Sequence, residues 1–186
     1  MAPQTATRLT YDDYVKLPDD GNRYEIIDGE LFVNPAPAPR HQTIVLNIAS
    51  SFRAYFRHHG GGVVFVSPID VLLAEGNVVQ PDVIVITDRR MGILGAKNVQ
   101  GAPDLAVEVL SDGSRRLDEI TKRKLYERGG VDEYWIVDPE LELVKIYRRT
   151  GAELARVAEI STETGETITV PLLPGFELPV ADVFAY

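Results

Sequence analysis

Two carboxylates stand in segments that are otherwise apolar. Asp82 opens an Asp-Val-Ile-Val-Ile run, and Glu108 lies inside the run Leu-Ala-Val-Glu-Val-Leu at residues 105–110. An ionised carboxylate in a dry interior costs several kcal/mol unless it is paired or bound to a metal ion. If the two strands are neighbours in one sheet, the two carboxylates repel each other, and a divalent cation would resolve this conflict while activating water. The alternative is structural: Asp82 terminates a strand, and Glu108 pairs with a buried arginine.

A helical pattern follows the second run. Asp118, Lys122 and Tyr126 recur at four-residue intervals, so they lie along one side of the expected helix. An ammonium group there could orient the attacking water or stabilise charge that develops on a phosphate. The alternative is an exposed Asp118–Lys122 ion pair, which is worth about 0.2–0.5 kcal/mol. The neighbouring apolar side, expected to face the sheet, consists of Leu117, Ile120 and Leu125.

His41 is the other candidate for chemistry. It stands at an expected helix start, after a bend that contains Pro35, Pro37 and Pro39. An imidazole in this place could reach the site as a base or as a donor to phosphate. The alternative is an ordinary residue of the first helical turn.

The composition sets limits on the metal and on the overall organisation. The chain has 186 residues, of which 45% are hydrophobic and 25% charged, and this favours one globular domain over residues 10–186 after a flexible tail at residues 1–9. The absence of cysteine excludes disulfides, zinc-thiolate sites and iron–sulfur clusters. Carboxylate oxygens favour Mg²⁺ or Mn²⁺.

The charge and hydropathy of the chain argue against several classes of protein. The net charge of -9 argues against a protein that coats DNA non-specifically, but it does not exclude a nuclease. No apolar run approaches the roughly 20 residues that span a bilayer, and the N-terminus lacks the apolar segment of a signal peptide, so a cytoplasmic location is expected. Several basic residues follow the second carboxylate in the sequence. They form either a cluster that contacts nucleic acid or a solvated helix face: Arg115, Arg116, Lys122, Arg123, Lys124 and Arg128.

The elements that would position these residues follow from periodicity and turn signals. Asp28-Gly29 joins a hairpin, residues 88–103 form an irregular and mobile loop beside the site, and the chain ends in a hairpin plus a docking segment. Helices are expected at about residues 11–15, 41–57 and 114–128. Strands are expected at residues 23–27, 30–33, 63–67, 70–74, 82–87, 105–110, 133–138 and 141–147.

Several motifs occur together in a characteristic order. They are Tyr-Glu-Ile-Ile-Asp-Gly-Glu at 24–30, Pro-Asp-Val at 81–83, Pro-Asp-Leu-Ala-Val-Glu-Val-Leu-Ser at 103–111, the Asp118, Lys122 and Tyr126 spacing, and Gly-Val-Asp-Glu-Tyr-Trp-Ile-Val-Asp at 130–138. In this combination the chain resembles the Uma2 family, also called DUF820, a restriction-endonuclease-like group within the PD-(D/E)xK nuclease superfamily. The resemblance runs from about Thr10 to the Leu-Pro-Gly-Phe segment at 173–176.

The resemblance implies an α/β fold with a mixed sheet of four or five strands flanked by helices, with additional β-hairpins. It implies a magnesium-dependent site in which Asp82, Glu108 and the Val109 backbone carbonyl bind the metal and Glu25 is a further acidic residue. The lysine of the superfamily usually stands two positions after the strand glutamate, where this chain has Leu110. Lys122 is then the matching lysine, with Tyr126 as a supporting residue.

The residues and the resemblance together leave three alternative functions to be tested. The first is a metal-dependent endonuclease that acts on nucleic acid, with DNA as the expected substrate and a homodimer as the expected assembly. The second is a catalytically silent module of the same fold that binds nucleic acid or protein. The third, a glycosidase with two carboxylates, would need a groove rich in exposed aromatic residues. Convergence of Glu25, Asp82, Glu108 and Lys122 at one point would distinguish the first function from the second.

Overall fold

The central sheet is built around two strands that are buried along almost their whole length, β6 (Val83–Thr87) and β8 (Leu105–Val109). In the computed structural model, which describes residues 8–34, 36–111 and 113–186, this sheet has six strands in the order β11-β10-β9-β8-β6-β3. Strands β8 and β9 are parallel, and the other neighbours are antiparallel. The strands are β3 (Gly62–Val66), β6 (Val83–Thr87), β8 (Leu105–Val109), β9 (Glu133–Asp138), β10 (Leu143–Thr150) and β11 (Glu153–Ser161).

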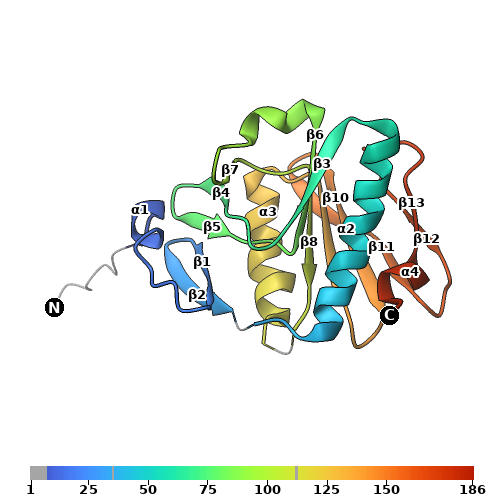
Figure 1. Cartoon of the computed structure of the whole chain (residues 1–186), viewed down its shortest axis with the longest axis horizontal. Helices are drawn as coiled ribbons and strands as arrows, with labels where there is room; N and C mark the ends of the chain where they lie inside the picture. Colours follow the sequence, from blue (N-terminus) through green and yellow to red (C-terminus); the bar gives the residue numbers. More distant parts are fainter. Residues whose placement is uncertain (1–7, 35, 112) are drawn as a thin grey trace.

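A second sheet lies beside the first, at the N-terminal side of the molecule (Figure 1). Its five strands are ordered β2-β1-β5-β4-β7, and its first hairpin turns at Asp28 and Gly29, which both have positive φ, as a type I′ turn requires. The strands are β1 (Arg23–Ile27), β2 (Glu30–Asn34), β4 (Val71–Ala74), β5 (Asn77–Val79) and β7 (Val99–Gln100). Residues 80–82 carry the chain from this sheet to the central one.

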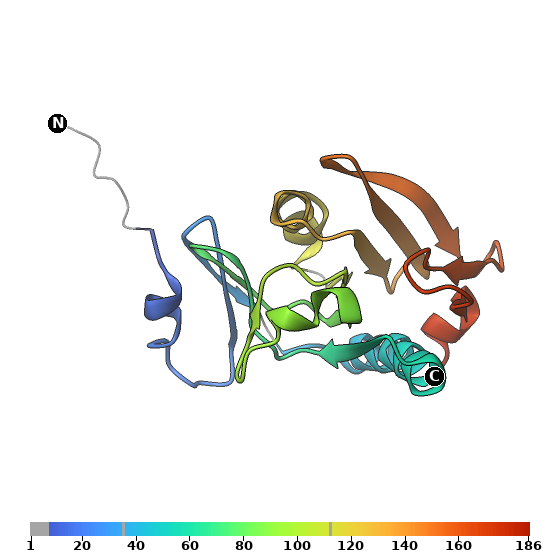
Figure 2. The same ribbon diagram turned by 90° about the horizontal axis from the view of Figure 1, so that it is seen from above.

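Helices cover the two faces of the central sheet. Helix α2 (Pro39–His59) lies on one face, and η2 (Leu117–Lys122) with α3 (Arg123–Gly129) lies on the other (Figures 1 and 2). Helix α2 starts at a proline, whose fixed φ suits the first helical turn. The remaining elements are α1 (Tyr11–Tyr14), η1 (Asp88–Ile93), α4 (Val180–Phe184) and a small sheet of β12 (Thr167–Thr169) and β13 (Glu177–Pro179).

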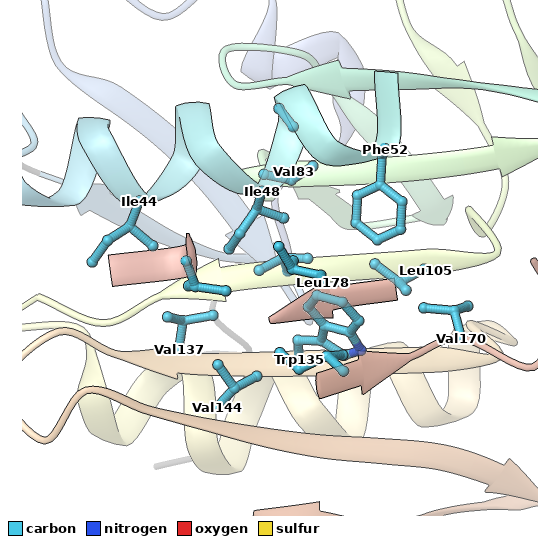
Figure 3. Packing of buried hydrophobic residues seen from close by; sticks show 14 of the residues in the cluster. Ile44, Ile48, Phe52, Val83, Leu105, Trp135, Val137, Val144, Val170 and Leu178 are labelled. Atoms are coloured by element: carbon cyan, nitrogen blue, oxygen red, sulfur yellow. The ribbon is translucent and has the colours of Figure 1, made fainter. Parts of the chain in front are cut away.

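Strand alternation divides the core in two. Val83, Val85, Leu105 and Val107 point towards α2, where Ile44, Ile48 and Phe52 pack above Trp135 (Figure 3). Ile84, Ile86 and Ala106 point to the opposite side, towards Leu125 and Tyr126 of α3. Glu108 belongs to this second set by its position in β8, so it faces the helix that carries Lys122.

The mixed sheet, the flanking helices and the extra hairpins agree with the predicted fold class, although the central sheet has six strands rather than four or five. Most element boundaries shift by a few residues. The predicted strand at 141–147 begins instead at Leu143, because Glu142 adopts a positive φ in the preceding turn. The tail at residues 1–7, and Pro35 of the proline-rich bend, lie outside the described residues.

Two predictions about neighbouring segments are wrong. Residues 88–103 do not lie beside the pocket described below, because Arg89 and Arg90 bind Asp104 and Asp132 at the opposite end of β8. Ile120 does not face the sheet and is 47% exposed, because the side of the helix that carries Asp118 and Lys122 is the buried one.

Candidate active site

The predicted residues line a pocket of about 630 Å³ where the two sheets meet. Asp82 and Glu108 form part of its wall, together with His41, Asp118 and Lys122. Glu25 and Tyr126 lie directly behind this wall, since each contacts a residue of it. The pocket is also lined by the end of β2, by the start of α2 and by the loop after β8.

Lys122 joins three carboxylates that come from three different elements. Its Nζ lies 2.9 Å from Glu25 Oε2, 3.1 Å from Glu108 Oε1 and 3.5 Å from Asp118 Oδ1. The Tyr126 hydroxyl donates to the same Glu108 oxygen at 2.6 Å. The alternative of an exposed Asp118–Lys122 pair is therefore wrong, because both side chains are buried.

The helical segment that carries Asp118 and Lys122 has an unusual geometry. Residues Leu117–Lys122 form a π-helical turn, which continues into the regular helix α3. Such turns place one more residue in each hydrogen-bonded ring than an α-helix does, and they are frequent at functional sites. Asp118 and Lys122 lie on its buried side.

Asp82 is held by donors from three elements. The Arg23 guanidinium donates to Oδ1 at 3.2 Å, His41 Nε2 lies 3.1 Å from Oδ2, and the backbone N–H of Val109 donates to Oδ2 at 2.9 Å. His41 is thus a buried partner of Asp82 rather than an ordinary residue of the first helical turn. Its Nδ1 has no hydrogen-bond partner among the described residues.

Glu25 is fixed from the second sheet. The Asn34 side-chain amide donates to Oε2 at 2.7 Å, and the backbone N–H of Gln80 donates to Oε1 at 2.7 Å. Glu25 is fully buried. Because Lys122 binds the same Oε2, this contact helps to tie the second sheet to the helical segment that covers the first.

The carboxylates have different affinities for protons. Burial raises the pKa of Glu108 well above its ordinary value, and Lys122 opposes this only in part, because Asp118, Asp82 and Glu25 raise it further. Burial likewise raises the pKa of Asp118. Burial would also raise the pKa of Asp82, but the hydrogen bonds from His41 and Val109 and the charge of Arg23 lower it below its ordinary value. Of these three carboxylates, Asp82 is therefore the one whose surroundings favour the ionised form.

The donor set fits a hard divalent cation. Asp82 and Glu108 both line the pocket, and both hydrogen bonds to Glu108 from described residues go to Oε1. Asp118 Oδ1 is buried and has no hydrogen-bond partner in the described part of the chain. Within those residues, no three His, Asp or Glu side chains are grouped as a ready metal cluster, so a metal here would draw on two carboxylates and on backbone or water oxygen.

Three residues of the site were not predicted: Arg23, Asn34 and Gln80. Arg23 stands two positions before Glu25 in β1, so both point to one face. The two-residue turn of the hairpin fixes the register that pairs Arg23 with Asn34. These two were therefore detectable from the sequence, whereas the Gln80 contact depends on how β5 packs beside β1.

The comparison with protein families identifies the group. The family model Uma2, described as "Putative restriction endonuclease", matches residues 11–181. The chain belongs to the Uma2 family. The motifs quoted above thus fall in a match that extends over nearly the whole chain.

A solved structure similar to this Uma2 chain is the crystal structure of "a putative nuclease belonging to DUF820" from Anabaena variabilis ATCC 29413. The two chains are 21% identical, with a TM-score of 0.79 over 95% of this chain and 97% of the other. At this identity the likeness shows the fold alone. The chain has no match among the curated proteins. Among the described helices of this Uma2 chain, none is long and apolar enough to cross a membrane.

Proposed function

We propose that the pocket is the active centre of a metal-dependent nuclease that hydrolyses phosphodiester bonds in nucleic acid, with DNA as the expected substrate. The observation that carries this proposal is the convergence of Glu25, Asp82, Glu108 and Lys122 at one pocket. The descriptions of the family as "Putative restriction endonuclease" and of the similar structure as "a putative nuclease" support the same reaction class. The position of Lys122, 3.1 Å from Glu108, supports its assignment as the lysine that is absent from the strand at Leu110.

Asp82, Glu108 and the Val109 carbonyl would hold Mg²⁺ or Mn²⁺. When bound, the ion would supply charge that promotes ionisation of water and offsets negative charge on the phosphate. Arg23 and His41 keep the Asp82 carboxylate ionised and oriented. Tyr126 orients Glu108 from behind.

Lys122 would stabilise the transition state. Its ammonium is a compact charge on a flexible stem, and it lines the pocket at the level of Glu108. A preorganised donor in a site shielded from water lowers the barrier more than the same donor does in bulk water. In the metal-free protein, Glu25 and Asp118 hold this ammonium at the wall of the pocket.

The pocket lining does not favour a glycosidase. None of the described residues that line it is Phe, Tyr or Trp, whereas a sugar groove would be expected to present such side chains. A silent binding module is distinguished from an enzyme only by an assay.

The assay uses labelled single-stranded and duplex DNA and RNA oligonucleotides with Mg²⁺, Mn²⁺ or EDTA. We expect metal-dependent cleavage by the wild type, a loss of at least about 100-fold in kcat in Lys122→Ala, and no cleavage by Asp82→Asn or Glu108→Gln. The matched control is Glu163→Gln, which changes an exposed glutamate. Cleavage that persists in Asp82→Asn and Glu108→Gln would contradict the proposed site. Sedimentation analysis of the same samples tests the proposed homodimer.

A further inference from the structure

The Lys122 ammonium lies at the point where three buried carboxylates meet. It is within 3.5 Å of an oxygen of Glu25, Glu108 and Asp118, and its side chain is only 4% exposed. Most lysines keep their charge in water, so burial of this one needs compensation from the surrounding carboxylates. The ammonium therefore acts as the counter-ion of the cluster.

One ammonium does not neutralise three carboxylates. The arginines of the pocket wall are directed to other partners: Arg23 to Asp82 and Ser67, Arg40 to Glu142, and Arg115 to Asp138. Asp118 Oδ1 is buried without a hydrogen-bond partner among the described residues, although Lys122 Nζ lies 3.5 Å away. The cluster thus has oxygen atoms that a second cation could use, but a single positive charge stands between them.

We infer that Lys122 is an internal cation that competes with the divalent metal for Glu108, and that metal binding displaces its ammonium from the cluster towards the pocket. This inference rests on the proposed function, because it assumes the metal site at Asp82 and Glu108. A divalent ion on Glu108 would repel an ammonium about 3 Å from the same carboxylate, and this repulsion would be strong in a buried site. The four-carbon stem of lysine lets the ammonium move without a change in the backbone.

The proposed competition predicts the direction in which metal affinity changes when the charge of Lys122 is removed. If two cations share one carboxylate, removing one of them strengthens the binding of the other. The Lys122→Met variant keeps the length and apolar body of the side chain but removes the charge. It should bind metal more tightly than the wild type, while the metal-free protein should be less stable because the three carboxylates lose their counter-ion.

Calorimetric titration with Mn²⁺ measures this change in metal affinity. We expect Lys122→Met to lower the dissociation constant by about 5- to 150-fold relative to the wild type. The matched control is Lys145→Met. Lys145 also pairs with a glutamate, Glu119 at 2.7 Å, but it is only partly buried and lies outside the pocket. The control should leave the dissociation constant unchanged.

The outcomes separate the two proposals. Wild-type binding that is lost in Asp82→Asn and Glu108→Gln but is equal or weaker in Lys122→Met would leave the metal site standing and overturn the competition. No binding in any variant, including Lys122→Met, would overturn both. Binding by Lys122→Met alone would support the competition in its strongest form.

A measurement on the wild type avoids any folding defect of the variant. Reductive methylation followed by mass spectrometry reports how accessible each lysine amine is. We expect Lys122 to react slowly without metal and about tenfold faster or more with saturating Mn²⁺, because the amine leaves its carboxylate partners. Lys145 should react at the same rate in both conditions. A Lys122 rate that metal does not change would overturn the displacement.

Discussion

Glu108 is the residue at which burial and charge oppose each other most directly. It shares a small volume with Glu25, Asp82 and Asp118, and its pKa is raised first by burial and then by these neighbours. A neutral amide in its place would keep the acceptor for Tyr126 and remove one negative charge. Side chains that serve a reaction are often poor for stability for this reason.

We therefore expect Glu108→Gln to stabilise the metal-free protein, by about 1 kcal/mol or more in the free energy of unfolding. Thermal denaturation in EDTA measures this, and the expected gain is about 2–4 °C in Tm. Glu163→Gln, at an exposed position, should change Tm little. A Glu108→Gln variant less stable than the wild type would show that the carboxylate is needed to pair with Lys122.

Asp138, at the end of β9, has a lowered pKa, in contrast to the raised pKa of Glu108. Burial would raise its pKa, but the hydrogen bonds from Arg115 and from the backbone N–H groups of Leu141 and Glu140 lower it below 3.8. A lowered pKa means that folding favours the ionised form. This stabilisation is complete above the unfolded-state pKa and is lost as the pH falls through the folded-state pKa.

The difference in unfolding free energy between the wild type and Asp138→Asn should accordingly be constant near neutral pH and shrink below a pH of about 4. Urea denaturation at a series of pH values from 7 to 3 measures it. Asp19→Asn, at an exposed position, is the matched control and should show a small difference at every pH. If the difference in unfolding free energy between the two proteins grew as the pH fell, Arg115 would not be stabilising the ionised form of Asp138.

The β1–β2 hairpin is the element that brings the second sheet into the site. It carries Arg23, Glu25 and Asn34, and its register depends on the turn at Gly29. Gly29 has a φ of 82°, and a Cβ atom there would lie 2.6 Å from the Cβ of Arg8. Both the backbone conformation and the close approach require glycine.

Gly29→Ala should destabilise the protein by about 1–3 kcal/mol, as measured by thermal or urea denaturation. Gly21→Ala separates the two causes, because Gly21 has a similar φ of 83° but no atom within 4 Å of the added Cβ. We expect the loss at Gly29 to exceed the loss at Gly21. Equal losses would mean that the contact with Arg8 contributes nothing.

Local sequence patterns were sufficient to predict the helices, strands and turns that depend on residues close together in the chain. The Asp28-Gly29 turn, the apolar strands around Asp82 and Glu108, and the long helix before Gly60 all follow from periodicity or from turn chemistry. The outward direction of Ile120 did not follow, because an amphipathic pattern cannot show which polar residues will be buried as partners of a distant glutamate. Glu25 entered only through the family resemblance, since its contact with Lys122 is tertiary.

At the scale of the whole molecule, the site depends on two sheets held side by side. Glu25 belongs to one sheet and Glu108 to the other, and residues 80–82 connect them. No local pattern predicted this division, because the strands at 77–79 and 83–87 follow each other closely in the sequence. Because the pocket is complete only when both sheets are folded, a ligand that binds there favours the folded state of the whole domain.

Metal binding should consequently raise the stability of the entire domain. At a free Mn²⁺ concentration of 100 times the dissociation constant, we expect a gain of about 2.7 kcal/mol, or roughly 5–10 °C in Tm. Differential scanning calorimetry with Mn²⁺ and with EDTA measures this. Asp82→Asn should abolish the shift, and an equal shift in that variant would place the bound metal elsewhere.

The packing beneath α2 has an optical consequence. Trp135 is the single tryptophan of the chain, and it is fully buried against Phe52 with its indole N–H bound to Glu133. Its emission therefore comes from one dry position in the larger core, and it shifts to longer wavelength when water reaches that position. Every substitution proposed above leaves this fluorophore in place, so intrinsic fluorescence can follow the unfolding of each variant without a label.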